Sequence, residues 1–115
     1  MPNLRIEDAI VWQKSRVFTR LIYAQFGKSK DFGFRDQILR AALSVMNNLA
    51  EGIESGTSKE LKRYFSIAKG SCGEVRSMLY AAYDIRYISH KDFLKLQEHA
   101  QEIAKIIASF RKNIR

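Results

Sequence analysis

The sequence predicts an all-α protein folded as an antiparallel, up-down four-helix bundle. Apolar residues recur at helical spacing in four segments, capping residues separate these segments, and no window alternates like a half-buried strand. Pro2 is the only proline, so no other position forbids a helix. We expect one domain over residues 1–115, with helices at about 7–26, 34–55, 58–88 and 90–113. Because the links are only a few residues long, consecutive helices must lie antiparallel.

Residues typical of helix ends mark the predicted boundaries. Gly27 and Gly56 follow the first two apolar segments, where a glycine commonly ends a helix. Residues 57–60, Thr-Ser-Lys-Glu, form a capping box that opens the third segment. Residues 89–92, Ser-His-Lys-Asp, open the fourth in the same way, with aspartate in place of glutamate.

Each of the last three segments carries one continuous apolar stripe, which predicts the face it buries. The stripes are Ile38, Ala42, Val45, Leu49 and Ile53; Leu61, Phe65, Ala68, Cys72, Val75, Leu79 and Ala82; and Leu96, Ala100, Ile103, Ile107, Phe110 and Ile114. Large and small residues alternate along them, which lets helices approach closely. We interpret Cys72 as a small core residue rather than a nucleophile.

The first segment has more apolar surface than one bundle face needs. Its apolar residues fall into three strips around the helix: Ile10, Val17, Leu21 and Ala24; Val11, Phe18 and Ile22; and Trp12, Tyr23 and Phe26. The second segment adds Leu39 and Met46 beside its core stripe. This excess predicts self-association through Trp12, Tyr23, Phe26, Leu39 and Met46. The alternative is that these residues fill a wide core.

Composition excludes several classes of site. A single cysteine cannot form an internal disulfide or a cysteine-based zinc site, and it fits a reducing cytoplasm. His90 and His99 are not spaced as a metal-binding pair. No apolar run is long enough to span a membrane, and the N-terminus does not resemble a signal peptide. We therefore expect a cytoplasmic protein that is not an enzyme, with no catalytic residue, no metal and no cofactor.

The charge balance points to a polyanionic partner. Lys and Arg number 20 against 12 Asp and Glu, so the formal net charge is +8 and the pI is about 9.8. Residues 1–50 and 51–115 each carry +4, so any binding surface must come from the fold rather than from a basic tail. RNA or DNA is the partner that this charge favours. The alternative is a charge that only promotes solubility.

The most regular cationic pattern lies in the third segment. Lys62, Lys69 and Arg76 are spaced by seven residues and align on one helix face. Lys59 and Arg63 flank them, small residues lie between, and we expect no acid in that stretch of the face. Arg16 and Arg20 make a second, smaller patch. These seven cations are the predicted phosphate contacts, and a merely solvated helix face is the alternative. Four tyrosines could stack bases or line the bundle rim: Tyr64, Tyr80, Tyr83 and Tyr87.

A polar strip accompanies the core stripe of the second segment. It contains Gln37, Ser44, Asn48, Glu51 and Ser55, and the candidate partners are Tyr64, Ser71 and Glu74 of the third segment, or Arg40. Buried polar groups need partners, so we interpret the strip as fixing helix register or a subunit contact. A small-molecule enzyme would instead need Asn48 and Glu51 to line a pocket.

Several short motifs resemble the four-helix-bundle family of 23S ribosomal RNA intervening-sequence proteins. They are Val11-Trp12-Gln13-Lys14, Gln37-x-x-Arg40-Ala41, Ser44, Asn48-Leu49-Ala50-Glu51-Gly52 and Ile67-Ala68-Lys69-Gly70-Ser71-x-x-Glu74. The resemblance covers nearly the whole chain in order. That family is related to accessory variability determinant proteins of diversity-generating retroelements, which form pentameric rings and bind a reverse transcriptase and nucleic acid. The resemblance thus implies a homopentamer, an RNA connection and a bacterial, cytoplasmic setting.

Together, the residues and the resemblance predict a non-enzymatic homo-oligomer that binds RNA, or a complex containing a nucleic-acid enzyme, through basic helix faces. No base specificity is expected, because nothing resembles an RNA-reading loop or sheet. A protein–protein adaptor, in which the same cations recognise an acidic protein surface, is the competing hypothesis.

Overall fold

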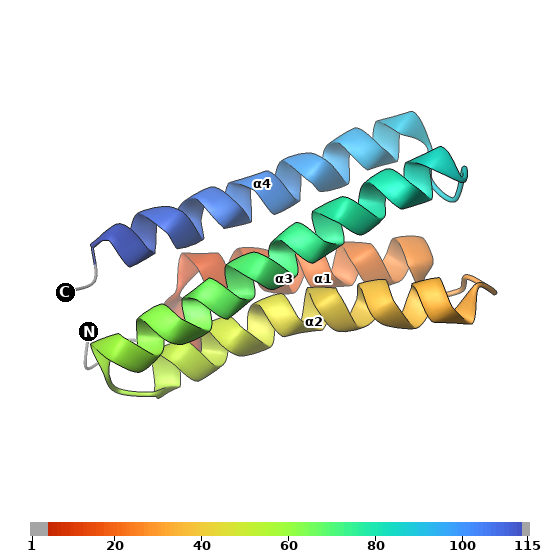
Figure 1. Cartoon of the computed structure of the whole chain (residues 1–115). Coiled ribbons are helices and arrows are strands. Elements are labelled where there is room, and N and C mark those ends of the chain that lie inside the picture. The colour runs from red at the N-terminus through yellow and green to blue at the C-terminus, as the bar shows by residue number, and fades with distance from the viewer. Residues whose placement is uncertain (1–4, 114–115) are drawn as a thin grey trace.

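The computed structural model describes residues 5–113, and they form a four-helix bundle (Figure 1). The elements are the 3-10 helix η1 (Ile6–Asp8) and the α-helices α1 (Ile10–Phe26), α2 (Phe32–Glu54), α3 (Ser58–Asp84) and α4 (His90–Lys112). Each helix packs against the next in the chain, and α4 closes the bundle against α1. Helices α1 and α3 therefore lie on opposite corners, as do α2 and α4. The predicted all-α, up-down architecture is confirmed.

Three predicted helix ends differ from the observed ones. The first helix begins at Ile10 rather than near residue 7, because the extended backbone of Ala9 separates it from η1. The second begins two residues early, at Phe32, because the Asp31 side chain accepts a hydrogen bond from the Phe34 backbone N–H at 3.2 Å. The third ends at Asp84 rather than near residue 88, because Arg86 adopts a left-handed φ of 65°.

The end of α3 has the hydrogen bonds of a Schellman motif. The backbone N–H of Tyr87 donates to the Ala82 carbonyl at 2.8 Å, and that of Arg86 donates to the Tyr83 carbonyl at 3.1 Å. Residues 85–89 then lead directly into α4. The predicted caps of α3 and α4 are confirmed: Thr57 accepts from the Glu60 N–H at 3.2 Å, and Ser89 accepts from the Asp92 N–H at 3.1 Å.

The stripes predicted for the last three helices form the core. All their members within the described residues are buried except Phe110, which is half-buried, and Ile114 lies outside the described residues. Cys72 is fully buried, and its thiol donates a hydrogen bond to the Ala100 carbonyl at 3.1 Å. Burial raises the pKa of this thiol to about 11, so it stays protonated near neutral pH. It is the core residue that the sequence indicated.

In α1, the structure selects one of the three apolar strips for the core. Val11, Phe18 and Ile22 are buried, whereas Ile10 of the first strip is 61% exposed. Phe26, which we predicted at an oligomer interface, is instead buried and packs edge-on against Phe34 with centroids 5.5 Å apart. That prediction is wrong because the core face of α1 extends one turn beyond Ile22 to include Phe26. Within residues 5–113, no helix is long and apolar enough to cross a bilayer.

Candidate nucleic-acid interface

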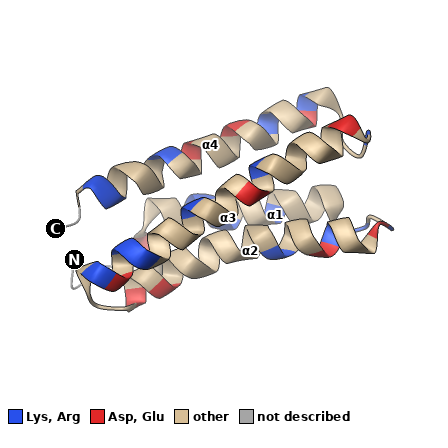
Figure 2. Cartoon of the chain, viewed as in Figure 1, with Lys and Arg blue, Asp and Glu red and all other residues tan. Residues whose placement is uncertain are grey.

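The outer face of α3 carries an exposed row of lysines. Lys59, Lys62 and Lys69 are all exposed, and Figure 2 shows blue segments along α3 from its N-terminal end to its middle. Between and beside them lie exposed small residues: Ser66, Gly70, Gly73 and Ser77. A Cβ added at Gly70 or Gly73 would meet no atom within 4 Å. The helix backbone is therefore open to close approach between long cationic side chains.

Arg63 differs from its neighbours because it is paired with an acid. Its Nη2 lies 2.9 Å from Glu60 Oε2, and its guanidinium sits 4.3 Å from the centroid of the Tyr64 ring. The hydrogen bond between the two side chains lowers the pKa of the Glu60 carboxyl and raises the pKa of the Arg63 guanidinium. The expectation that this stretch of the face contains no acid is therefore wrong. Glu60 offsets part of the positive charge at this end of α3.

Arg76 continues the row, but it also holds α3 to α4. It is half-buried, and its Nε donates to Gln97 Oε1 at 3.2 Å. The amide Nε2 of Gln97, a buried residue, donates in return to the Arg76 backbone carbonyl at 2.9 Å. Arg76 is thus both a cation of the face and a packing residue, so its substitution would disturb the fold as well as the charge.

The register between α3 and α4 sets two further exposed lysines at the same heights along the bundle axis as lysines of α3. Ring contacts of Tyr80 with Phe93 and of Tyr83 with His90, together with the pairing of Arg76 with Gln97, define an antiparallel register. In that register, Lys69 is level with Lys105. The next heptad step on each helix sets Lys62 level with Lys112, and both α4 lysines are exposed. Lys105 and Lys112 were not among the predicted phosphate contacts, although their spacing of seven residues is evident in the sequence.

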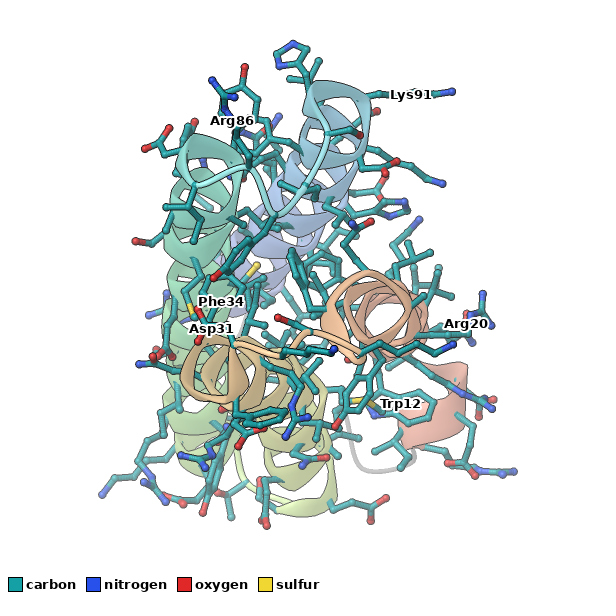
Figure 3. All side chains as sticks on the ribbon, turned by 90° about the vertical axis from the view of Figure 1, so that its right-hand side faces the viewer. Trp12, Arg20, Asp31, Phe34, Arg86 and Lys91 are labelled. Atoms are coloured by element: carbon teal, nitrogen blue, oxygen red, sulfur yellow. The ribbon has the colours of Figure 1, made fainter. Side chains whose placement is uncertain are left out.

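The second predicted cationic patch lies elsewhere. Arg16 and Arg20 are exposed on α1, the helix diagonally opposite α3. The Arg16 guanidinium is 5.9 Å from the centroid of the Trp12 ring, and Figure 3 shows Arg20 pointing away from the bundle. Within one subunit, the structure therefore does not combine this patch with the lysines of α3.

The predicted polar strip divides into a packed part and a solvated part. The hydroxyl oxygens of Ser44 and Ser71 lie 2.8 Å apart across the contact between α2 and α3. The amide Nδ2 of Asn48 donates to both the carbonyl and the hydroxyl oxygen of Ser44, at 2.8 and 2.9 Å. Gln37 and Glu51 of the strip are exposed, as is the candidate partner Glu74. The packed part supports the interpretation that these polar groups set the register of the two helices.

The remaining residues predicted at an oligomer interface lie on α1 and α2. Trp12, Leu39 and Met46 are half-buried, while Tyr23 is 42% exposed. Trp12, labelled in Figure 3, and Leu39 pack against the edge of the core. In the described part of the chain, no three His, Cys, Asp or Glu side chains gather in a way that could hold a metal ion.

Comparisons with known proteins agree with this architecture. The family model described as 23S rRNA-intervening sequence protein matches residues 7–109. A crystal structure of a protein of unknown function from the S23 ribosomal protein family of Bacteroides thetaiotaomicron VPI-5482 is similar, with a TM-score of 0.83. The two share 23% sequence identity, and the match covers 90% of this chain and 100% of the other. None of the curated proteins compared with the chain matches it.

Proposed function

Because the chain belongs to the 23S rRNA-intervening sequence protein family, we propose that it is a non-enzymatic RNA-binding protein that acts as a homo-oligomer. Its ligand would be RNA alone, or RNA within a ribonucleoprotein such as a reverse-transcriptase complex. The observation that carries this proposal is the exposed lysine row of α3, Lys62 and Lys69, which lies level with Lys112 and Lys105 of α4.

The dimensions and chemistry of this face suit a phosphate backbone. From Lys62 to Arg76 the row is about 20 Å long, since an α-helix rises about 1.5 Å per residue. Lysine ammonium groups bound to phosphates release condensed counterions, which supplies affinity without reading sequence. The open backbone at Gly70 and Gly73 lets a strand lie close to the helix between the cations.

Self-association would compensate for the modest size of each cationic face. A single subunit offers few free cations in one place, because Arg63 is paired with Glu60 and Arg16 and Arg20 lie on the diagonal helix. In an oligomer, binding of one subunit to the RNA raises the effective concentration of the other subunits near it, so several weak contacts together give a higher overall affinity. The half-buried and exposed apolar residues of α1 and α2 support an interface there, namely Trp12, Tyr23, Leu39 and Met46. We propose a pentamer.

A gel-mobility experiment tests RNA binding directly. RNA affinity should fall about tenfold or more between about 50 and about 200 mM salt if a few phosphates are contacted. The double variant Lys62→Glu/Lys69→Glu should abolish the shift while helical content stays unchanged. Arg76 is left intact because it anchors Gln97. The matched control is Lys28→Glu/Lys30→Glu, which makes the same charge change at exposed lysines of the α1–α2 link. Equal loss in both variants would show that the α3 face is not the site.

A pull-down from lysate with and without nuclease separates RNA binding from the adaptor hypothesis. Partners that depend on RNA should be lost after nuclease treatment. Partners that remain and still depend on Lys62 and Lys69 would instead identify an acidic protein surface as the ligand. Analytical ultracentrifugation at micromolar concentration tests the oligomeric state. A clean monomer would contradict the proposed self-association.

A further inference from the structure

An exposed aromatic patch lies at the far end of the α3–α4 seam from Lys62. It consists of Tyr80, Tyr83 and His90, whose rings gather around the buried ring of Phe93. Tyr80 is 53% exposed and Tyr83 is 38% exposed, so both rings are accessible to a ligand. We call this set the aromatic patch.

The rings of the aromatic patch are held in place by one another. Tyr80 meets Phe93 edge-on with centroids 5.1 Å apart, and Tyr83 stacks on Phe93 at 4.8 Å with an interplanar angle of 28°. His90 lies against Tyr83 at 5.4 Å. Because these neighbours already restrict the rings, a ligand that covers them loses little side-chain entropy on binding.

Another tyrosine at this end of the bundle has a different role. The hydroxyl of Tyr87 donates to Asp31 Oδ2 at 2.7 Å, and its ring packs edge-on against Phe34 at 5.5 Å. Tyr87 therefore ties the α3–α4 link to the start of α2. Figure 3 shows Asp31 and Phe34 together at this junction. Tyr80 and Tyr83 point instead along the α3–α4 seam, where each packs against Phe93 of α4.

The aromatic patch continues the cationic row of α3. Arg76 follows Lys69 by seven residues, Tyr80 follows Arg76 by four, and Tyr83 follows Tyr80 by three. These are helical spacings, so all four residues lie on one face of α3. Figure 3 shows Arg86, in the α3–α4 link, and Lys91, at the start of α4, at this end of the bundle, pointing to opposite sides. Arg86 adopts its left-handed φ of 65° at a position where helices usually end in glycine, and it thus supplies a cation where glycine would supply none.

We propose that the aromatic patch stacks unpaired bases of single-stranded RNA whose phosphate backbone lies along the cationic row of α3. The proposal rests on the RNA binding proposed above and specifies its ligand. A duplex keeps its bases stacked inside and exposes only their edges, whereas a single strand offers whole base faces to aromatic rings. Cations that follow the backbone, next to rings that accept bases, form the combination that single-strand binders use. Because stacking tolerates any base, the face should prefer single-stranded over double-stranded RNA without preferring a particular sequence.

The test measures the fluorescence anisotropy of a labelled single-stranded RNA and of the same sequence as a duplex. The wild-type protein should bind the single strand more tightly. The variant Tyr80→Leu/Tyr83→Leu keeps an apolar cover on Phe93 but removes both ring faces. It should bind the single strand roughly 5- to 150-fold more weakly, the range expected for loss of one stacked base. The variant Tyr80→Phe/Tyr83→Phe keeps the ring faces and should bind like wild type.

Two further measurements separate stacking from a general loss of binding. A 2-aminopurine base in the single strand should lose fluorescence on binding to wild type, because stacking quenches it, and should not do so with the leucine variant. The matched control is Phe32→Leu, which removes another exposed ring with an arginine over it, outside the seam. This control should bind like wild type. The slope of affinity against salt should be unchanged by the leucine substitutions, since they remove no phosphate contact.

Distinct results overturn the two proposals. If Lys62→Glu/Lys69→Glu loses RNA while Tyr80→Leu/Tyr83→Leu binds like wild type, the stacking proposal fails and RNA binding stands. Tighter binding of the duplex than of the single strand also overturns stacking. If the wild-type protein binds neither RNA at low salt, the proposed function fails, and the ligand assigned to the patch fails with it.

Discussion

Replacing Gly52 with alanine should destabilise the protein, even though alanine favours helices over glycine. Gly52 is buried in α2, the helix that packs most extensively against α3. A Cβ at this position would lie 3.1 Å from Phe65 Cδ1, 3.2 Å from Tyr64 Cβ and 3.3 Å from the Leu61 carbonyl oxygen. The close approach of the two helices therefore depends on the missing side chain.

Two opposing effects set the magnitude. Alanine in a helix interior is favoured over glycine by about 1 kcal/mol. Overpacking a well-packed core costs about 1–3 kcal/mol. One of the crowded atoms belongs to the α3 backbone, and another belongs to Phe65, which is fully buried, so neither can withdraw without moving α3. We expect overpacking to win, with a net loss of about 1 kcal/mol.

Gly70 and Gly73 provide matched controls in α3. Both are helical and exposed, with no atom within 4 Å of an added Cβ. Gly70→Ala and Gly73→Ala should each stabilise the protein by about 0.5–1 kcal/mol, because only helix propensity changes.

Urea unfolding followed by circular dichroism measures all three variants. In thermal unfolding, the same loss of about 1 kcal/mol would lower the Tm of a domain this size by about 4 °C. The three m-values should agree, so that the midpoints report stability alone. If Gly52→Ala stabilises the protein as much as Gly70→Ala does, the inferred close contact between α2 and α3 is wrong.

Three other predictions concern buried or capping groups. Burial raises the pKa of the Cys72 thiol to about 11, so its contribution to stability is complete below about pH 9 and is lost as the pH rises through 11. Cys72→Ala should therefore lose less stability than wild type over that window, in urea titrations at each pH. Asp31→Ala should lower the free energy of unfolding by about 1 kcal/mol, because it removes the N-cap of α2. Tyr87→Phe removes only the hydrogen bond between the α3–α4 link and Asp31, so it should lower the free energy of unfolding by less. Equal losses in the two variants would contradict the capping role. Arg76→Leu should cost about 1–3 kcal/mol because it leaves the buried Gln97 oxygen without its donor, and Arg76→Leu/Gln97→Leu should recover part of that loss.

The core of α3 could be predicted from the sequence, whereas that of α1 could not. Every core position of α3 from Leu61 to Ala82 is apolar, so the buried face was evident. In α1 the core face is interrupted by buried Ser15 and Thr19. Their hydroxyls donate to the carbonyls of Val11 and Ser15, both at 2.8 Å, which satisfies them inside the core. The spacing of apolar residues alone therefore could not show which of the three strips faces the core, because that depends on tertiary packing.

The candidate site was also predictable in part. The heptad spacing of Lys62 and Lys69 identified exposed cations, and the spacing of Glu60 and Arg63 by three residues could have indicated their ion pair. The pairing of Arg76 with Gln97 could not be predicted, because it depends on the register of two helices that no local pattern fixes.

The salt dependence of single-stranded RNA binding tests the central claim most directly. Plotting log affinity against log salt for wild type and for Lys62→Gln/Lys69→Gln reports how many phosphates the α3 row neutralises. The wild-type affinity should fall steeply with salt, and losing two phosphate contacts should make the slope shallower by about 1.4. A wild-type slope near zero, or identical slopes for the two proteins, would contradict a phosphate backbone bound along α3.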